Sequence, residues 1–594
     1  MLQSLDIYYE SRADGQRQIL SRLHKRSPLF VTSEVLCFVA AVGFVALSTI
    51  TDSRWLPLLL SVLSLVAYVV VRIADSRNTR LMQRARALLK VYEGEQAYRR
   101  GDFHAFDDGE RYMDAHHPFT FDLDIFGPAS LYNRLCRTAT TGGSDVLARE
   151  LSSVSNRAGR YALIAELAAR CDFREYFQSY GVENKVDTDF RDVLSQMEGV
   201  SCPTCIVSRP FRLFAALSVA GFFVSVAATV LSYIPVGVPI TWGLAQFFLA
   251  WALTSGPLHR LQRSVGSLHD RLPSFCNLVN LTVSQSSLKA EDGQQILRQL
   301  EGAPEALRHF GRIVQKMDSR NNILGLFITD SLAMRDVFIL SDFLHWRESS
   351  ASRLQQWADA VAMMDALVSM ATFRYNEPEA VKPKVVESDG IVYEAQSLWH
   401  PFLGRKAVSN DFNIADRNFY IITGANMAGK STFLRTVGIN YVMAMCGLPV
   451  MAKSLRISHF GLFTSMRTTD DLTRGISYFN AELLRLQQLL DYCSTQKRTL
   501  IILDEILKGT NSLDKLNGSR LFLEHVMQSP VSGIVATHDL ELSKMESPRI
   551  HNFCFEIQLG ADVTYSYKIT PGVARNQNAT FLLRRMLADD NTEP

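Results

Sequence analysis

The sequence has no surplus of charge of either sign and no long internal repeat. Its 594 residues include 62 lysines and arginines and 60 aspartates and glutamates, for a formal net charge of +2. This balance excludes a chain whose overall charge attracts nucleic acid, although local basic patches are still allowed. The lack of a repeat argues against a solenoid. With 47% hydrophobic and 21% charged residues, the chain is also not mainly disordered.

Cysteine is scarce and shows no paired pattern. The nine cysteines are an odd number and are scattered along the chain, which argues against a disulfide scaffold and for a reducing compartment. Only Cys202 and Cys205 form a CxxC motif. A zinc site normally needs a second such pair, and a redox motif needs a thioredoxin-like βαβ context. Because the sequence has neither, we expect two thiols without a metal or redox role.

Charge is missing altogether from several apolar runs. Leu213–Leu258 is 46 residues long and contains no Asp, Glu, Lys or Arg. Since one membrane-spanning helix needs about 20 apolar residues, this run predicts two spans, broken by the turn-forming Tyr233–Pro239. Val35–Thr51 and Trp55–Val71 repeat the pattern more weakly. The alternative for each pair is a buried helical hairpin in a soluble core.

Basic residues flank the four apolar segments and predict their orientation. They are Arg22, Lys25, Arg26, Arg72, Arg77, Arg80, Arg84, Arg86, Arg209, Arg212, Arg260 and Arg263. The positive-inside rule then places both termini and the long middle segment in the cytoplasm, and membrane lipid becomes a partner of four transmembrane helices. The first span leads directly into the second, so we expect an anchor and not a cleaved signal peptide. The charge-free interiors favour anchoring over transport.

The pattern changes from helical to mixed at about residue 385. The two preceding soluble stretches show mainly helical spacing. Short β-rich runs, separated by helical stretches, then follow at Gly390–Tyr393, Asn418–Thr423, Thr499–Leu503 and Gly533–Ala536. Strands that alternate with helices predict a largely parallel sheet, which carries its ligands at the carboxyl ends of the strands.

A phosphate-binding loop follows the second of these runs. Its residues fit GxxxxGK[ST] and lie between a predicted strand and a predicted helix: Gly424, Ala425, Asn426, Met427, Ala428, Gly429, Lys430 and Ser431, followed by Thr432. Backbone N–H groups in such a loop bind phosphate oxygens, helped by the helix N-terminus. We expect Lys430 to reach the β- and γ-phosphates of ATP, and Ser431 to bind Mg²⁺.

Two further strand ends carry candidate catalytic groups. Asp504 and Glu505 end an apolar strand; we expect Asp504 to hold the Mg²⁺ shell and Glu505 to orient the attacking water. The alternative is two acids at an ordinary strand-end turn. His538 follows another apolar strand and could contact the γ-phosphate or the water; alternatively, Thr537 caps a helix and His538 is incidental.

Together these motifs resemble the MutS family of DNA mismatch-repair ATPases. The resemblance rests on Thr423–Thr432, Asp504–Thr510, Ser477–Glu482, His400-Pro401 and Pro571–Ala574, and more loosely on Leu135–Gly143 and Met364–Ser369, which resemble the ends of the family's helical levers. It implies a dimer with composite ATP sites, in which Ser477 faces the γ-phosphate bound by the other subunit. It also implies adenine packing by Val408 and Tyr567, and double-stranded or branched DNA as a candidate partner.

The sequence also departs from the family's mismatch readers. Residues 1–28 are too few for the mismatch-reading domain with its Phe-x-Glu wedge, and we interpret Phe173-Arg-Glu175 as part of the levers. Some relatives carry a nuclease domain of the Smr type after the ATPase, and we expect none here. Mismatch recognition is therefore not expected from the motifs, whereas ATP hydrolysis is.

The predicted architecture is a C-terminal α/β P-loop (ABC-like) ATPase domain, joined to an all-α lever domain that transmembrane helical hairpins interrupt. The segments are a cytoplasmic N-terminal segment (1–28), transmembrane hairpin 1 (29–73), a cytoplasmic lever-like region (74–208), transmembrane hairpin 2 (211–257), a second lever region (258–382) and the ATPase domain (383–594). The leading hypothesis is a membrane-anchored MutS-like ATPase. The alternatives are an ABC-like transport ATPase, whose LSGGQ signature is missing here, and a nucleotide-gated scaffold with a protein or lipid client.

Overall fold

The chain forms two compact units in the computed structural model. The structure describes residues 2–51, 55–200, 202–266, 268, 271–318, 323–467, 478–559 and 563–575. The sheet unit comprises Met1–Arg137, Leu147–Arg174 and Leu367–Pro594, and the helical unit comprises Thr138–Val146 and Glu175–Ala366.

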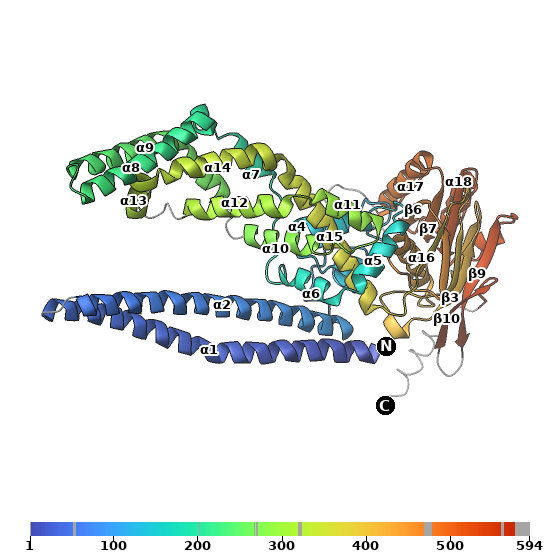
Figure 1. Ribbon diagram of the computed structural model, residues 1–594. Coiled ribbons are helices and arrows are strands. Elements are labelled where there is room, and N and C mark those ends of the chain that lie inside the picture. Colours follow the sequence, from blue (N-terminus) through green and yellow to red (C-terminus); the bar gives the residue numbers. More distant parts are fainter. Residues whose placement is uncertain are drawn as a thin grey trace. The chain divides into compact units, whose positions relative to one another are not determined.

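The sheet unit begins with two long helices that run side by side (Figure 1). They are α1 (Leu2–Ile50) and α2 (Trp55–Arg99). Both continue far beyond their apolar windows, and their polar halves are joined by an ion pair between Arg99 and Asp6 (2.5 Å) and another between Arg17 and Glu93 (2.9 Å). Residues 2–28 are therefore the first part of the long helix α1.

A buried polar network ties these two helices to the rest of the sheet unit. Glu95 of α2 accepts hydrogen bonds from Arg137 Nε (2.9 Å) and from Asn376 Nδ2 (2.7 Å). Asn376, at the end of α15 (Leu354–Asn376), accepts one from the Tyr9 hydroxyl of α1 (2.8 Å). All four side chains are buried, so each polar group has its partner inside the protein.

Six strands form the main sheet in the order β10-β9-β4-β8-β7-β6, in which all pairs except β10–β9 are parallel. The strands are β4 (Phe419–Gly424), β6 (Gly461–Ser465), β7 (Thr499–Asp504), β8 (Val531–Thr537), β9 (Ile550–Leu559) and β10 (Val563–Pro571). The carboxyl ends of β4, β8 and β7 are thus neighbours at one edge. A smaller sheet has the order β1-β5-β2-β3 and comprises β1 (Lys384–Val386), β2 (Tyr393–Leu398), β3 (Asn410–Ile414) and β5 (Ser454–Ser458).

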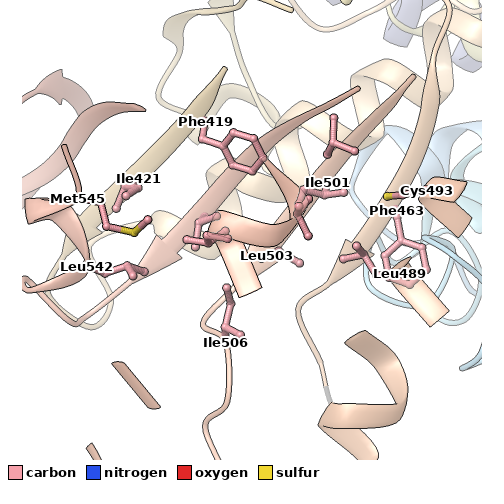
Figure 2. Packing of buried hydrophobic residues seen from close by; sticks show 14 of the residues in the cluster. Phe419, Ile421, Phe463, Leu489, Cys493, Ile501, Leu503, Ile506, Leu542 and Met545 are labelled. Atoms are coloured by element: carbon pink, nitrogen blue, oxygen red, sulfur yellow. The ribbon is translucent and has the colours of Figure 1, made fainter. Parts of the chain in front are cut away.

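Apolar side chains of the main sheet pack against helices that cover it. Phe419, Ile421, Ile501 and Leu503 point into one cluster with Leu489 (Figure 2). The helices that contribute to this cluster are α17 (Tyr478–Thr495) and α18 (Ser512–Val526), while α16 (Lys430–Met445) packs on β4, β7 and β8. This burial fixes the edge at which the strands end.

One predicted strand begins later than expected. The run at Gly390–Tyr393 becomes β2 only from Tyr393 onward. The preceding N–H groups bond to side chains instead of a neighbouring strand: Ile391 N donates to Asp416 Oδ1 and Val392 N to Ser458 Oγ. The local β-rich composition could not reveal these partners.

The remaining elements are helical. The shorter helices between α2 and α8 are α3 (Leu131–Leu135), α4 (Thr141–Leu151), α5 (Tyr161–Ala168), α6 (Cys171–Ser179) and α7 (Arg191–Glu198). The helical unit contains α8 (Arg209–Val230), α9 (Gly237–Gly266), α10 (Arg271–Val283), α11 (Glu291–Gln299), α12 (Ala303–Asp318), α13 (Ile323–Ala333) and α14 (Arg335–Ser350). Among the described residues, α1, α2, α8 and α9 are long and apolar enough to cross a membrane.

A buried carboxylate joins the beginning and the end of the helical unit's chain. Asp365 of α15 accepts hydrogen bonds from the backbone N–H groups of Ala139 (3.0 Å) and Thr140 (2.7 Å). A Cβ atom on Gly143 would lie 2.1 Å from Asp365 Oδ2, so only glycine fits this approach. Burial raises the pKa of Asp365 to about 6, and its hydrogen bonds oppose that shift.

Candidate functional site

The glycine-rich loop connects β4 to α16 through backbone conformations that favour glycine. Gly424 has a φ of 155° and Gly429 a φ of 106°. A Cβ atom at Gly424 would lie 3.0 Å from the Phe555 carbonyl oxygen of β9. The loop therefore turns sharply at the edge of the sheet, and α16 begins directly after Gly429. This strand–loop–helix geometry directs the helix N-terminus toward the edge where anions bind.

The Lys430 side chain is folded back over this loop. Its Nζ donates hydrogen bonds to the carbonyl oxygens of Gly424 (2.8 Å) and Ala425 (3.0 Å). Burial lowers the pKa of Lys430 to about 8, and the carboxylates of Asp504 and Glu505 oppose that shift. The ammonium is thus held at the mouth of the loop, where it can contact a phosphate.

Ser431 and Asp504 meet across the edge. The Ser431 hydroxyl donates a hydrogen bond directly to Asp504 Oδ2. A hydroxyl and a carboxylate oxygen are the hard donors that suit Mg²⁺, which usually keeps substrate phosphates and water as its other ligands. In the described part of the chain, no group of three or more His, Cys, Asp or Glu side chains could hold a metal ion by itself. The pair therefore fits a Mg²⁺ ion that a phosphate group shares.

Glu505 occupies a constrained position just beyond β7. Its φ of 61° lies in the left-handed region, and its backbone N–H donates to the Ala536 carbonyl of β8 (2.9 Å). Its carboxylate faces Lys515 Nζ of α18 at 3.4 Å and His538 Nε2 at 3.2 Å. Lys515 and His538 thus orient the Glu505 carboxylate, which is largely buried.

His538 lies between the loop and the acids. Its ring nitrogens are 3.4 Å from Lys430 Nζ. Burial and then the Lys430 ammonium lower the pKa of His538, while Glu505 opposes that shift. Thr537 does not cap a helix here; its hydroxyl accepts a hydrogen bond from Asp539 N in the loop after β8 (3.0 Å). Of the two interpretations of this motif, the capping one is therefore wrong.

These side chains line one cavity of about 800 Å³. The predicted residues in its wall are Val408, Asn426, Met427, Ala428, Gly429, Lys430, Ser431, Thr432, Asp504, Glu505, His538 and Tyr567. Gly424 and Ala425 are not part of this wall, but their carbonyl oxygens accept hydrogen bonds from Lys430, which is. Tyr567 approaches the loop closely, because a Cβ atom on Gly429 would lie 3.1 Å from its ring. Ser477 lies outside the described residues, so its predicted contact across a dimer stays a prediction.

Other side chains support the site although no role was predicted for them. Glu482 of α17 is buried, and its two carboxylate oxygens accept hydrogen bonds from the backbone N–H groups of Lys508 and Gly509, both at 3.0 Å. It thereby clamps the loop that follows Glu505. Lys515 was missed as well. A basic residue in the first turn of the helix after an acid pair was the available signal.

The fold and the edge define the class of α/β proteins in which a glycine-rich loop joins a strand to a helix at the carboxyl edge of a parallel sheet. Residues 420–581 match the family model described as MutS domain V. Over these residues the chain is therefore similar to domain V of the MutS family.

Curated proteins show the same relationship over part of their length. The chain is 34% identical to DNA mismatch repair protein MutS of Staphylococcus epidermidis over 244 residues, which cover 37% of this chain and 27% of that protein. It is 32% identical to DNA mismatch repair protein MutS of Acetivibrio thermocellus (43% and 30% covered). It is 29% identical to MutS protein homolog 4 of Homo sapiens (38% and 25% covered). The matched part therefore spans about a quarter to three tenths of these relatives.

Proposed function

We propose that this protein is a membrane-anchored ATPase that binds and hydrolyses Mg²⁺-bound ATP at the edge of its main sheet. The observation that carries the proposal is the convergence of three strand ends. The loop after β4, the acids after β7 and His538 after β8 line one cavity of about 800 Å³. Similarity to relatives that are named mismatch repair proteins supports it.

The chemistry follows from what each side chain can do. Loop N–H groups and Lys430 bind the phosphates and neutralise their charge. Ser431 and Asp504 would hold a Mg²⁺ ion, which would supply further charge neutralisation. Glu505 is oriented by Lys515 and His538, and it accepts a hydrogen bond from the attacking water and positions it for in-line attack.

The helices of two hairpins supply the membrane anchor. In the most apolar window of α1 and of α2 only 6% of the residues are buried, and in those of α8 and α9 the shares are 17% and 28%. A hairpin in a soluble core would bury most of these side chains, since large exposed apolar patches are unusual in water. The basic residues at the flanks of these helices support a cytoplasmic location for the sheet unit and both termini.

The client is proposed from the relatives. Two of them are named DNA mismatch repair proteins, so double-stranded or branched DNA is the first candidate. The protein acts as a dimer with composite sites, in which Ser477 of one copy completes the cavity of the other. The alternative is that ATP binding and hydrolysis control the binding of a protein or lipid client. ATPase measurements with and without DNA distinguish a DNA client from these.

The test is the ATPase rate of the full chain in lipid nanodiscs, with and without duplex, mismatched and branched DNA. Lys430→Ala should abolish nucleotide binding. Glu505→Gln should retain ATP but slow turnover by about 10²–10⁴-fold, the usual contribution of a positioned base. Glu524→Gln, in an exposed pair with Arg520 on α18, is the matched control. Wild-type turnover in the two site variants would refute the site. Stimulation by DNA that falls with salt would support the DNA client, and a rate indifferent to DNA would refute it.

A further inference from the structure

Helix α13 has the composition of a membrane-facing segment although it is only 11 residues long. Its sequence, ILGLFITDSLA, holds one ionisable side chain, Asp330. That side chain is buried, and its Oδ1 accepts a hydrogen bond from the backbone N–H of Asp336 (2.9 Å). Three large apolar side chains of the helix are exposed: Phe327, Ile328 and Leu332 are 41%, 53% and 39% exposed.

The neighbours of α13 belong to the apolar hairpin formed by α8 and α9 (Figure 1). The rings of Phe327 and Phe247 lie 5.0 Å apart. A Cβ atom on Gly243 would lie 3.5 Å from the Ser331 carbonyl oxygen. An apolar groove of about 340 Å³ lies between parts of these three helices, and its wall includes Phe222 of α8.

These contacts occur deep within the charge-free run of the hairpin. Phe222 is nine residues beyond Leu213, where that run begins, and Phe247 is 11 residues before Leu258, where it ends. At 1.5 Å per residue these positions lie about 14 and 17 Å inside, close to the middle of a hydrocarbon layer about 30 Å thick. A helix that packs here lies at the same depth.

A charged cluster marks where the chain leaves the aqueous side. Asp342 of α14 forms ion pairs with Arg212, at the start of α8 (3.7 Å), and with Lys316, near the end of α12 (3.6 Å). Both the helix that precedes α13 and the one that follows it therefore meet the cytoplasmic end of the hairpin. The described part of the chain between them is α13, which contacts the hairpin away from that end.

We propose that α13 is a re-entrant helix embedded in the hydrocarbon beside α8 and α9, with lipid acyl chains covering its exposed face and filling the apolar groove. With a length of about 16 Å it is too short to span the layer, so it enters and leaves from the cytoplasmic side. Its helical backbone satisfies its own polar groups, as hydrocarbon requires. In water the same face would leave three large apolar side chains and the groove exposed. The inference rests on the proposed membrane crossing of α8 and α9.

Spin labelling tests this placement in the full chain. The background replaces the five cysteines that are not buried by serine (Cys37, Cys171, Cys202, Cys205 and Cys276) and keeps the four buried ones. A nitroxide is attached to a cysteine at Ile328 and, in a second variant, at Leu332. The protein is reconstituted in liposomes, and collision of the label with oxygen and with a water-soluble nickel chelate is measured.

Two further labels serve as references. Val224→Cys reports a position on α8 that is 68% exposed, and Glu348→Cys reports an exposed position on α14. We expect the Ile328 and Leu332 labels to match Val224, with high oxygen and low nickel accessibility. If both match Glu348 while Val224 is lipid-exposed, the re-entrant placement is overturned and the membrane crossing stands. If the Val224 label is also accessible to nickel, the proposed membrane crossing of α8 and α9 is refuted, and with it the re-entrant placement of α13.

Discussion

Replacing Glu482 by glutamine removes a charge from the clamp that holds the loop after β7. Both carboxylate oxygens accept backbone hydrogen bonds at 3.0 Å, from Lys508 and Gly509. The amide keeps one acceptor and turns an NH₂ group toward the other N–H. A hydrogen bond to a charged group contributes about 1.5–3 kcal/mol, so we expect the loop to open more easily by at least that amount.

The strain of the loop explains why this loss should affect catalysis. Glu505 and Leu507 both have positive φ values, 61° and 57°, which cost about 1–3 kcal/mol each for residues other than glycine. Without the clamp the loop relaxes, and Glu505 moves away from the attacking water. Because a displacement of about 1 Å can cost about 100-fold, turnover should fall by about tenfold or more. Nucleotide affinity should change little, since the phosphate loop makes none of these contacts.

Two assays check the reasoning. Hydrogen exchange at the amides of residues 508 and 509 should accelerate by about 10–150-fold, because 1.4 kcal/mol corresponds to a factor of ten. Steady-state ATPase measurements should show the fall in kcat. Glu524→Gln, on the exposed face of α18, should leave both unchanged. Native exchange and native kcat in Glu482→Gln would refute the clamp.

Three other predictions concern charge and packing. Lys430, with a pKa of about 8, should lose its proton and its positive charge as the pH rises. ATP affinity measured from about pH 7 to 9.5 should therefore fall. The free energy of unfolding should rise between about pH 8 and pH 10.5, because Lys430 binds its proton more tightly in the unfolded chain than in the folded protein. Gly143→Ala should destabilise the fold by more than about 3 kcal/mol in chemical unfolding, whereas Gly159→Ala, which meets no neighbour, should not. Glu95→Ala should cost about 3–5 kcal/mol of unfolding free energy, because it leaves buried Arg137 unpaired; a thermal shift below about 2 °C would contradict that.

The succession of apolar strand runs and polar motifs along the chain was enough to predict that the site residues lie at one edge of the sheet. The glycine-rich loop, Asp504 and His538 each follow an apolar strand run, and parallel strands place such ends at one edge. The expected runs at 418–423 and 499–503 coincide with β4 and β7 almost to the residue. The strand order, with β8 between β4 and β7, was not readable, because it depends on which strands pair.

Contacts between residues far apart in the chain could not be predicted from the sequence, for a physical reason. Glu482 and Lys508 are 26 positions apart, and Glu95 and Asn376 are 281 apart. No periodicity or spacing rule relates such pairs, since their approach is decided by packing of whole elements. The length of α1 was missed for a similar reason: polar residues before Pro28 hid a helix that packing against α2 sustains.

The buried network of Tyr9, Glu95, Arg137 and Asn376 gives the first hairpin a stiff attachment. If this hairpin crosses a membrane as proposed, a flexible tether would leave the sheet unit free to rotate above the bilayer, whereas a rigid one would confine it to a plane with a fixed axis. Two copies in one membrane would then meet already aligned, with much of their rotational freedom lost before they touch. Their pairing would depend on the number of copies per area of lipid, and diluting the suspension of vesicles should leave it unchanged.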